Sequence, residues 1–312
     1  MKGPSPVPST SNEPDRHPFV SIIIPVLDDA DNARRCLQYL AKQTFPSDRF
    51  EMIIVDNGSS NDLGLLAEFD RAKLVVEPKP GSYAARNRGV REARGTILGF
   101  TDAICKPEPH WIEHAVSLLV SDSSKAYLAG KTIFEFSDPD DLHPAEVYQW
   151  VNWGRQKEHL EDYGFAACAN LFARRELFEN VGPFDETLMT GGDFEWGRRV
   201  RAYGAGQIYC DDAVVIHPSR KRVREIVVQE ARRFDGIYQL IRRGAPGARG
   251  LIRSLFFALF SMPGWRRLTK ERRARLRTVA ETLTYLAVAE LLRWTRVIEW
   301  VRMSLGASPR RK

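Results

Sequence analysis

Two apolar segments of this 312-residue chain run directly into an aspartate. Glu51–Val55 (EMIIV) precedes Asp56, and Thr96–Thr101 (TILGFT) precedes Asp102. Short β-branched runs of this kind are typical of buried parallel strands, and open α/β sheets bind ligands just beyond the carboxyl ends of such strands. A third run, Phe19–Val26 (FVSIIIPV), ends in Pro-Val. The sequence therefore predicts a ligand crevice where these three strand ends meet.

Helical patterns alternate with these strands. Asp31 can cap a helix that reaches Lys42, Leu63–Phe69 is expected to be helical, and Lys73–Val76 is expected to be a short strand. An amphipathic helix then starts after Gly81 and stops at Gly95. This β-α-β-α-β-α-β alternation predicts an α/β fold with a parallel, doubly wound sheet and right-handed crossovers.

Several short sequence motifs, in this order, resemble those of the family 2 glycosyltransferases. They are GSYAARN from Gly81, TDA from Thr101, P-x-P-x-W from Pro107, RRELF from Arg174, VGPFDE from Val181 and GGDFE from Gly191. The resemblance implies the GT-A nucleotide-sugar fold, which is a Rossmann-like, mostly parallel sheet flanked by helices. Here a helical C-terminal extension is expected to follow it.

The resemblance also implies roles for individual residues in the donor site. The turn at Pro25 and Val26 would lie against the base and ribose of a nucleotide, and Asp56 would accept a hydrogen bond from the base. Arg86 would be the basic contact to the nucleotide, and Asp102 opens the family's D-x-D motif. An Asp followed by Asn-Gly-Ser, as at position 56, is also a common turn former, so a structural role stays open there.

Asp193 lies in the word GGDFE, where the family has its general base. An inverting transfer requires one carboxylate to take the proton of the acceptor hydroxyl as that oxygen attacks the anomeric carbon. Gly-Gly-Asp before a helix is also an ordinary N-cap signature. Both roles can hold together, because a cap would fix the position of the carboxylate.

The predicted metal site departs from the family pattern. The D-x-D word normally ends in an acid that helps to hold a divalent cation on the diphosphate, but Ile104 occupies that position. An isoleucine cannot ligate Mg²⁺ or Mn²⁺, which prefer oxygen. Many family members place a histidine where His217 ends the strand-like VVIH, so Asp102 and His217 are the predicted metal pair. The alternatives are a purely structural His217, and basic residues that neutralise the diphosphate in place of a cation.

The C-terminal third of the chain is strongly basic. From His217 to Lys312 there are 23 Lys or Arg and 7 Asp or Glu, a net charge of +16, whereas the remainder carries −10. Within Glu271–Leu305, apolar residues recur near helical spacing. This pattern predicts helices at an anionic membrane surface; the alternative is that they pack on the catalytic domain. No nucleic-acid motif accompanies the charge, so nucleic acid is not expected as a partner.

Three regions are predicted. Residues 1–18 form a disordered leader, 19–218 a GT-A domain with a nucleotide-binding half (19–107) and an acceptor half (108–218), and 219–312 a basic amphipathic helical extension. The four cysteines are widely spaced, as in a reduced cytoplasmic protein, and no apolar run reaches the roughly 18–20 residues that span a bilayer. The protein is therefore expected to lie in the cytoplasm, peripherally on the inner face of the cell membrane.

The expected function is transfer of a sugar from a nucleotide sugar, such as a UDP- or GDP-sugar, to a lipid-linked, polysaccharide or other cell-envelope acceptor. The alternative is a catalytically impaired GT-A module that acts as a membrane-associated nucleotide-sugar-binding or scaffold protein. Ile104 favours the alternative and Asp193 argues against it.

Overall fold

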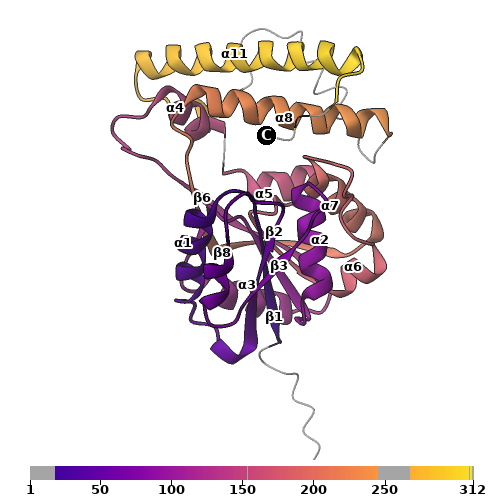
Figure 1. The fold of residues 1–312 in the computed structure, drawn as a ribbon. Coiled ribbons are helices and arrows are strands. Elements are labelled where there is room, and N and C mark those ends of the chain that lie inside the picture. Colours follow the sequence, from indigo (N-terminus) through magenta and orange to yellow (C-terminus); the bar gives the residue numbers. More distant parts are fainter. Residues whose placement is uncertain (1–17, 153, 245–267, 309, 311–312) are drawn as a thin grey trace, which may run out of the picture.

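One mixed sheet of eight strands crosses the part of the chain that the structure describes (Figure 1). In this computed structural model the described residues are 18–152, 154–244, 268–308 and 310. The apolar segment Leu251–Phe260 and all but the last residue of the predicted leader lie outside them.

The order of the strands in the sheet is β3-β2-β1-β4-β7-β6-β8-β5. Their bounds are β1 (Val20–Val26), β2 (Phe50–Asp56), β3 (Ala72–Val76), β4 (Ile97–Thr101), β5 (Lys106–Pro107), β6 (Lys125–Glu135), β7 (Asn170–Arg174) and β8 (Gly206–Pro218). β3, β2, β1 and β4 run parallel, and β7 is antiparallel to both β4 and β6. β8 is parallel to β6 and antiparallel to β5. The four strands predicted to run parallel thus form one half of the sheet.

Side chains of the central strands alternate between two apolar clusters, one on each face of the sheet. Ile22 and Ile24 of β1 pack with α1 (Ala30–Leu40) and α3 (Trp111–Val120). Ile23 packs on the opposite face, in the cluster that includes residues of α2 (Ser82–Glu92), α6 (Glu176–Asn180) and α7 (Gly192–Tyr203). Because both faces are covered, the strands are apolar at successive positions, which explains the unbroken hydrophobic runs in the sequence.

Three helical predictions differ from the structure. The N-cap of α1 is Asp29, and Asp31 lies inside the helix. Leu63–Phe69 contains only a 3₁₀ turn, Gly64–Glu68. Further along the chain, α4 covers Pro144–Asn152, and α5 (Gln156–Glu158) runs into a π turn at His159–Tyr163. Gly154, with φ 81°, lies between them in a conformation that favours glycine. The last predicted helix is divided into α10 (Lys270–Ala274) and α11 (Val279–Ser304), because Thr278 caps a new helix by accepting from the Glu281 N–H at 3.0 Å.

The helices α4, α8 (Val223–Arg242) and α11 form a separate layer above the sheet (Figure 1). Two small clusters hold the layer together. They contain Ala145, Ile226, Val288 and Leu292 in one, and Val147, Val151, Leu268 and Tyr285 in the other. Although α4 precedes β7 and β8 in the sequence, it therefore packs with helices that lie much later in the chain, α11 more than a hundred residues on.

A charged network ties α11 to α8. The Arg302 guanidinium donates to both carboxylate oxygens of the buried Asp235 at 2.8 Å, and Arg296 pairs with Glu230 at 2.8 Å. α8 is in turn anchored on the body, since Leu240 belongs to the same core cluster as Ile23. None of the helices in the described ranges is long and apolar enough to cross a membrane.

Candidate active site

The carboxyl ends of β1 and β2 lie side by side and form one wall of the candidate site. Pro25 pairs with Val55 and Val26 with Asp56 in the parallel register. The Val26 side chain is buried in the core, so only its backbone can contact a ligand. Asp56 Oδ1 accepts from the Ser59 N–H at 2.8 Å, which is the turn-forming role that the Asp-Asn-Gly-Ser sequence left open. The other carboxylate oxygen has no hydrogen bond to any residue that the structure describes, so both roles are sterically compatible.

Asn57 organises this wall, a role that its position in the sequence does not reveal. Its Oδ1 accepts from the Gly81 N–H at 2.7 Å, and its Nδ2 donates to the carbonyls of Glu77 and Lys79 at 3.0 and 2.7 Å. These bonds fix the segment that leads into α2, where Gly81 has φ 126°, a value that few other residues adopt. The signal was visible in the sequence as an Asn after a strand, but its partners lie 20 or more residues away.

Arg86 is a nearly buried residue of the candidate site, in direct contact with Asp102. It is 5% exposed, its Nη2 donates to Asp102 Oδ1 at 2.6 Å, and its guanidinium lies 5.6 Å from the centre of the Tyr83 ring. Burial alone would lower the pKa of Arg86, but the neighbouring groups, among them Asp102 and Asp193, outweigh burial and raise it. Nε of Arg86 is buried and has no hydrogen-bond partner in the described part of the chain. A permanently charged donor is thus held between the two predicted functional acids.

Asp193 is the second residue of α7 and interacts electrostatically with Arg86 and Asp102. The N-cap of α7 is Gly191, with φ 80°, so Asp193 does not cap the helix. Its Oδ1 accepts from the Phe194 N–H at 2.9 Å and from the Tyr83 hydroxyl at 3.1 Å. Burial raises the pKa of Asp193, and the hydrogen bonds from Phe194 and Tyr83 together with the charge of Arg86 oppose that rise. A positioned carboxylate of raised pKa is the kind of group that accepts a proton near neutral pH.

Three possible metal ligands converge near the end of β8. Ligand atoms of Asp102, Cys105 and His217 all lie within 4.8 Å of one another. His217 Nδ1 donates to the Pro218 carbonyl at 2.8 Å, which leaves Nε2 available to a ligand, and burial lowers the pKa of His217. Burial raises the pKa of the Cys105 thiol to about 12, so this group is neutral near pH 7. The structure brings the predicted pair, Asp102 and His217, together.

The structure shows where the residue that replaces the second acid of the D-x-D motif lies. Ile104 packs against the apolar cluster on the α1 and α3 face of the sheet. The turn is closed by the Cys105 N–H, which donates to the Asp102 carbonyl at 2.9 Å, and Cys105 rather than residue 104 contributes to the three-residue group. The donor set therefore offers one carboxylate oxygen and one imidazole nitrogen, a set that fits a weakly held divalent cation completed by a ligand's own oxygens.

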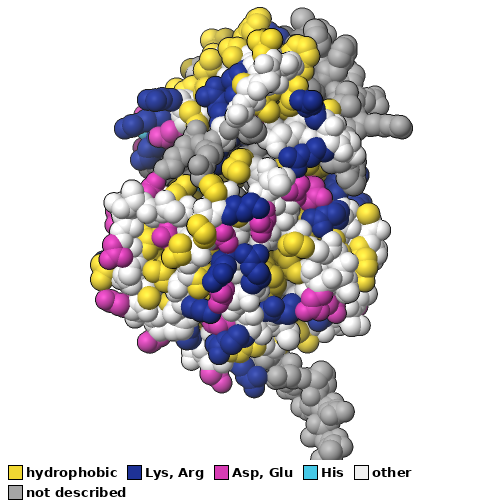
Figure 2. Space-filling model, turned by 45° about the vertical axis from the view of Figure 1, so that its right-hand side comes forward, with side chains coloured by type: hydrophobic (Ala, Val, Ile, Leu, Met, Phe, Trp, Pro, Cys, Tyr) yellow, Lys and Arg dark blue, Asp and Glu magenta, His cyan; other side chains and the backbone are white. Residues whose placement is uncertain are grey.

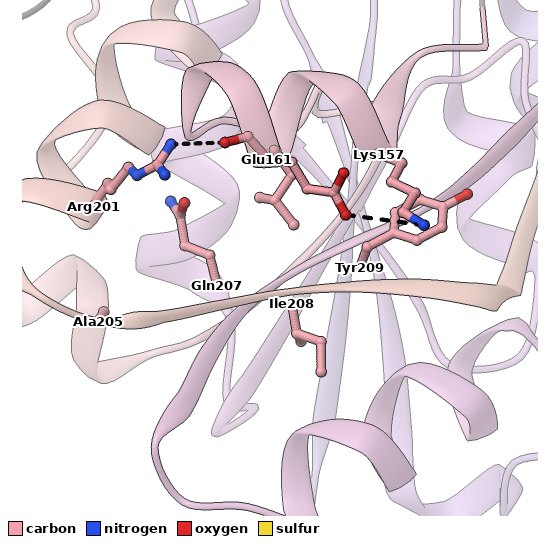
Figure 3. Close-up of a pocket in the computed structure, with 8 residues that line it drawn as sticks. Lys157, Glu161, Arg201, Ala205, Gln207, Ile208 and Tyr209 are labelled. Carbon is pink, nitrogen blue, oxygen red and sulfur yellow. Dashed lines mark hydrogen bonds and ion pairs between the residues drawn. The ribbon is translucent and has the colours of Figure 1, made fainter.

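A cavity of about 600 Å³ lies away from these residues, between the start of β8, the end of α7 and the α5 segment (Figure 3). Its charged groups are satisfied locally: Arg201 donates to the Glu161 carbonyl, and Lys157 lies 4.0 Å from the Glu161 carboxylate. The lining includes none of the predicted site residues. A second cavity, of about 520 Å³, lies beside the predicted site, between the segment before Asp193 and α8.

A mixed sheet of this kind, with acids at the carboxyl ends of β2 and β4 and a further carboxylate on α7, has the arrangement of the GT-A class. Over residues 21–182 the sequence matches the model of Glycosyl transferase family 2. It is 35% identical over 209 residues to glycosyltransferase AglE of Haloferax volcanii, which covers 65% of this chain and 68% of that protein. The chain belongs to glycosyl transferase family 2, and the predicted glycosyltransferase activity is confirmed at that level.

Two further likenesses extend beyond the matched family segment. One is the dolichyl N-acetyl-alpha-D-glucosaminyl phosphate 3-beta-D-2,3-diacetamido-2,3-dideoxy-beta-D-glucuronosyltransferase of Methanococcus voltae, which is 22% identical over 240 residues and covers 72% of this chain and 75% of that protein. The other is the solved mannosyltransferase PcManGT from Pyrobaculum calidifontis in complex with GDP-Man and Mn²⁺, with a TM-score of 0.64 at 20% identity, covering 92% of this chain and 87% of that one. The predicted fold class is thereby confirmed.

Proposed function

We propose that this glycosyltransferase takes a sugar from a nucleotide-sugar donor and transfers it, with inversion, to a hydroxyl of a lipid-linked or other cell-envelope acceptor. The observation that carries the proposal is the placement of Asp193, a carboxylate of raised pKa that shares Arg86 with the acid at the end of β4, Asp102. The GDP-Man in the PcManGT complex supports a nucleotide-sugar donor, and the name of the Methanococcus voltae enzyme supports a lipid-linked acceptor.

In the proposed reaction the acceptor oxygen attacks the anomeric carbon as the bond from that carbon to the donor's phosphate oxygen breaks. Asp193 accepts the proton of the attacking hydroxyl, and the nucleoside diphosphate leaves with the electron pair of the broken bond. Arg86 would stabilise the negative charge that develops on the diphosphate, because its guanidinium is already buried and oriented before the reaction begins. Asp56 and the backbone at Pro25 and Val26 would bind the nucleotide base and ribose.

A divalent cation, Mn²⁺ or Mg²⁺, fits beside Asp102 and His217. When bound, it would neutralise charge on the diphosphate. Arg86 already binds Oδ1 of Asp102, so the other carboxylate oxygen would be the one available to a cation. With two suitable ligands among the residues that the structure describes, we propose that cation binding is weak until the donor's phosphate oxygens complete the site.

We also propose that the helical layer attaches the enzyme peripherally to the cytoplasmic face of an anionic membrane. The outward side of α11 exposes Val279 (77%), Leu283 (62%), Trp294 (52%) and Ile298 (60%), and Leu305 (84%) follows as the C-cap. The inward side of α11 packs on α4 and α8. Hydrophobic side chains gather across this upper end of the molecule in Figure 2. Glu290, which pairs with Arg293, interrupts this face, but a largely apolar face on a helix in a basic region is typical of interfacial attachment.

The alternative, a nucleotide-sugar-binding module with impaired catalysis, keeps one specific observation in its favour, which is the core-facing Ile104. The test is a panel of nucleotide sugars, each measured for thermal stabilisation of the protein with and without Mn²⁺. Hydrolysis of the stabilising donor, absent in Asp193→Asn, is expected for the transferase. Stabilisation by a donor without hydrolysis or transfer by the wild type would favour the impaired module, and no stabilisation by any donor would contradict both.

A further inference from the structure

The 520 Å³ cavity beside the candidate active site has a wall dominated by arginines. It is lined by Thr190, Arg220, Arg222, Arg224, Arg232 and Arg233, and we call it the arginine pocket. Glu225 is the one acid among its described lining residues. Five guanidinium groups against one carboxylate make the pocket strongly positive, so the ligand that fits it is an anion.

The pocket is physically joined to the segment that carries the proposed base. Thr190 lies three residues before Asp193, and its Oγ1 donates to the Arg232 carbonyl at 2.7 Å. α8 approaches so closely here that a Cβ on Gly236 would lie 2.3 Å from Thr190 Oγ1. This contact fixes the arginine-bearing half of α8 against the segment that leads to Asp193.

The other side of the pocket adjoins the proposed diphosphate site. Arg220 follows His217 by three residues. Burial lowers the pKa of Arg220, the negative charges of Glu225 and Asp102 raise it, and the positive charge of Arg232 lowers it further. Arg220 therefore interacts electrostatically both with Asp102 of the candidate active site and with Arg232 of the pocket.

Much of the positive charge in the pocket is uncompensated. Arg222, Arg224 and Arg232 form no ion pair with any residue in the described ranges. Arg232 Nε is buried and has no hydrogen-bond partner there. Arg222 is also the N-cap of the 20-residue α8 and provides no side-chain cap, so the positive end of this helix faces the same region. Buried donors without partners are costly unless a ligand satisfies them.

We propose that the arginine pocket binds the phosphate or diphosphate group of the acceptor, an inference that rests on the proposed transferase function and names its substrate class more closely. Guanidinium groups bind phosphate oxygens through paired N–H donors, and several can surround one diphosphate. No lining residue comes from β1, β2 or β4, whose ends form the donor crevice. The acceptor hydroxyl must reach Asp193, and a phosphate held beside Thr190 would lie on that side of the base.

The test measures binding directly, on the full-length protein, by calorimetric titration with UDP and GDP present in excess. The probes are farnesyl diphosphate, inorganic pyrophosphate and farnesol, which carry the phosphate with a lipid, the phosphate alone and the lipid alone. The variant is R222Q/R224Q, two exposed side chains outside the core. R242Q is the matched control, because Arg242 is an exposed arginine at the opposite end of the same helix and outside the pocket.

R222Q/R224Q should weaken both phosphate-bearing probes by roughly tenfold for each lost guanidinium, while R242Q leaves them unchanged and farnesol is unaffected by either. Farnesyl diphosphate binding tighter than pyrophosphate identifies a lipid-linked source, and equal affinity identifies a soluble phosphate-bearing acceptor. Unchanged pyrophosphate affinity in R222Q/R224Q, or a matching loss of UDP or GDP affinity when each nucleotide is titrated alone, overturns the proposal. Failure of the donor panel would contradict the proposed function separately, since this titration needs no turnover.

Discussion

Arg86 and Asp102 form a direct link between the two halves of the candidate active site, with 2.6 Å between Nη2 and Oδ1. Arg86 belongs to α2, and Asp102 is the residue that follows β4. The pair therefore joins a helix on one face of the sheet to the carboxyl end of a central strand. The same guanidinium influences Asp193 on α7. One buried cation therefore interacts both with the acid that follows β4 and with the carboxylate on α7.

Asp193→Asn should lower the transfer rate by about 100- to 10,000-fold, because an amide cannot accept the proton of the acceptor hydroxyl. Donor binding should survive, since Asp56 and Arg86 are untouched. The measurements are the transfer rate and the thermal stabilisation given by the donor. A variant that keeps more than about a tenth of the wild-type rate would contradict the role of general base.

The same substitution should make the protein more stable at neutral pH. Burial raises the folded-state pKa of Asp193 above its ordinary value of 3.8. A carboxyl of raised pKa contributes stability below its unfolded pKa and loses that contribution as the pH rises through its folded pKa. The substituted amide stays neutral at every pH, so the variant's advantage in melting temperature should be present at pH 7 and vanish below the ordinary aspartate pKa of 3.8. Asp31→Asn, at an exposed position on α1, is the control and should show no such gain.

Tyr83→Phe should shift the acid limb of the rate–pH profile to higher pH. The Tyr83 hydroxyl donates to Asp193, and that bond opposes the rise in the pKa of Asp193 that burial causes. Without the donor the base stays protonated to a higher pH, whereas the rate on the alkaline plateau should change less. Tyr209→Phe, in the remote 600 Å³ cavity, should leave the profile in place. An unshifted acid limb in Tyr83→Phe would argue against Asp193 as the titrating base.

Ile104→Asp should tighten Mn²⁺ binding by adding a carboxylate beside Asp102, but at a cost in stability. Ile104 packs against the core, so the new carboxylate must leave its apolar neighbours and turn toward the crevice. The melting temperature should fall in metal-free buffer and recover in part with Mn²⁺. Ile104→Asn controls for lost packing without added charge. Tight Mn²⁺ binding by the wild type, unchanged in Ile104→Asp, would show that residue 104 is irrelevant to the metal.

Replacing Leu283 and Ile298 by serine should weaken attachment to anionic liposomes without changing donor binding. Both side chains lie on the outward face of α11 and are 62% and 60% exposed, so neither contributes to the buried clusters. Leu65→Ser is the matched control, because Leu65 is 65% exposed but lies on the catalytic body. Co-sedimentation at low and high salt measures the effect, and the remaining binding should be salt-sensitive because the basic residues are retained. Equal co-sedimentation of all forms would mean that this face is not the attachment surface.

The parallel half of the sheet and its acids could be predicted from the sequence because the signals are local. Asp56 and Asp102 each follow an apolar run directly, and the strand determines where each side chain lies. The packing of Ile104 on the core and the grouping of Cys105 with His217 could not be predicted, because they depend on a turn and on a strand over 100 residues away. The assignment of roles to Asp56, Asp193 and His217 stays a prediction.

Tyr83 and the arginine pocket were missed for a similar reason. Nothing in the sequence near Tyr83 indicates its role, because its hydroxyl contacts α7, 110 residues further on. The arginines of α8 were included in the predicted membrane-binding region, because the sequence shows how many there are but not which way their side chains point. In the folded chain, five of the arginines in the basic region line a cavity beside the catalytic body.

The position of α4 has a consequence for how the chain is made. Ala145, Val147 and Val151 are covered by residues from α8 onward, up to Leu292. At about 5–20 residues per second, the ribosome exposes that apolar helix for on the order of ten seconds before its last partners emerge. Strands β7 and β8 are complete well within that interval. A protein truncated after β8 would therefore leave the apolar side of α4 permanently exposed, as it is in the nascent chain. That product should depend on chaperones to remain in solution.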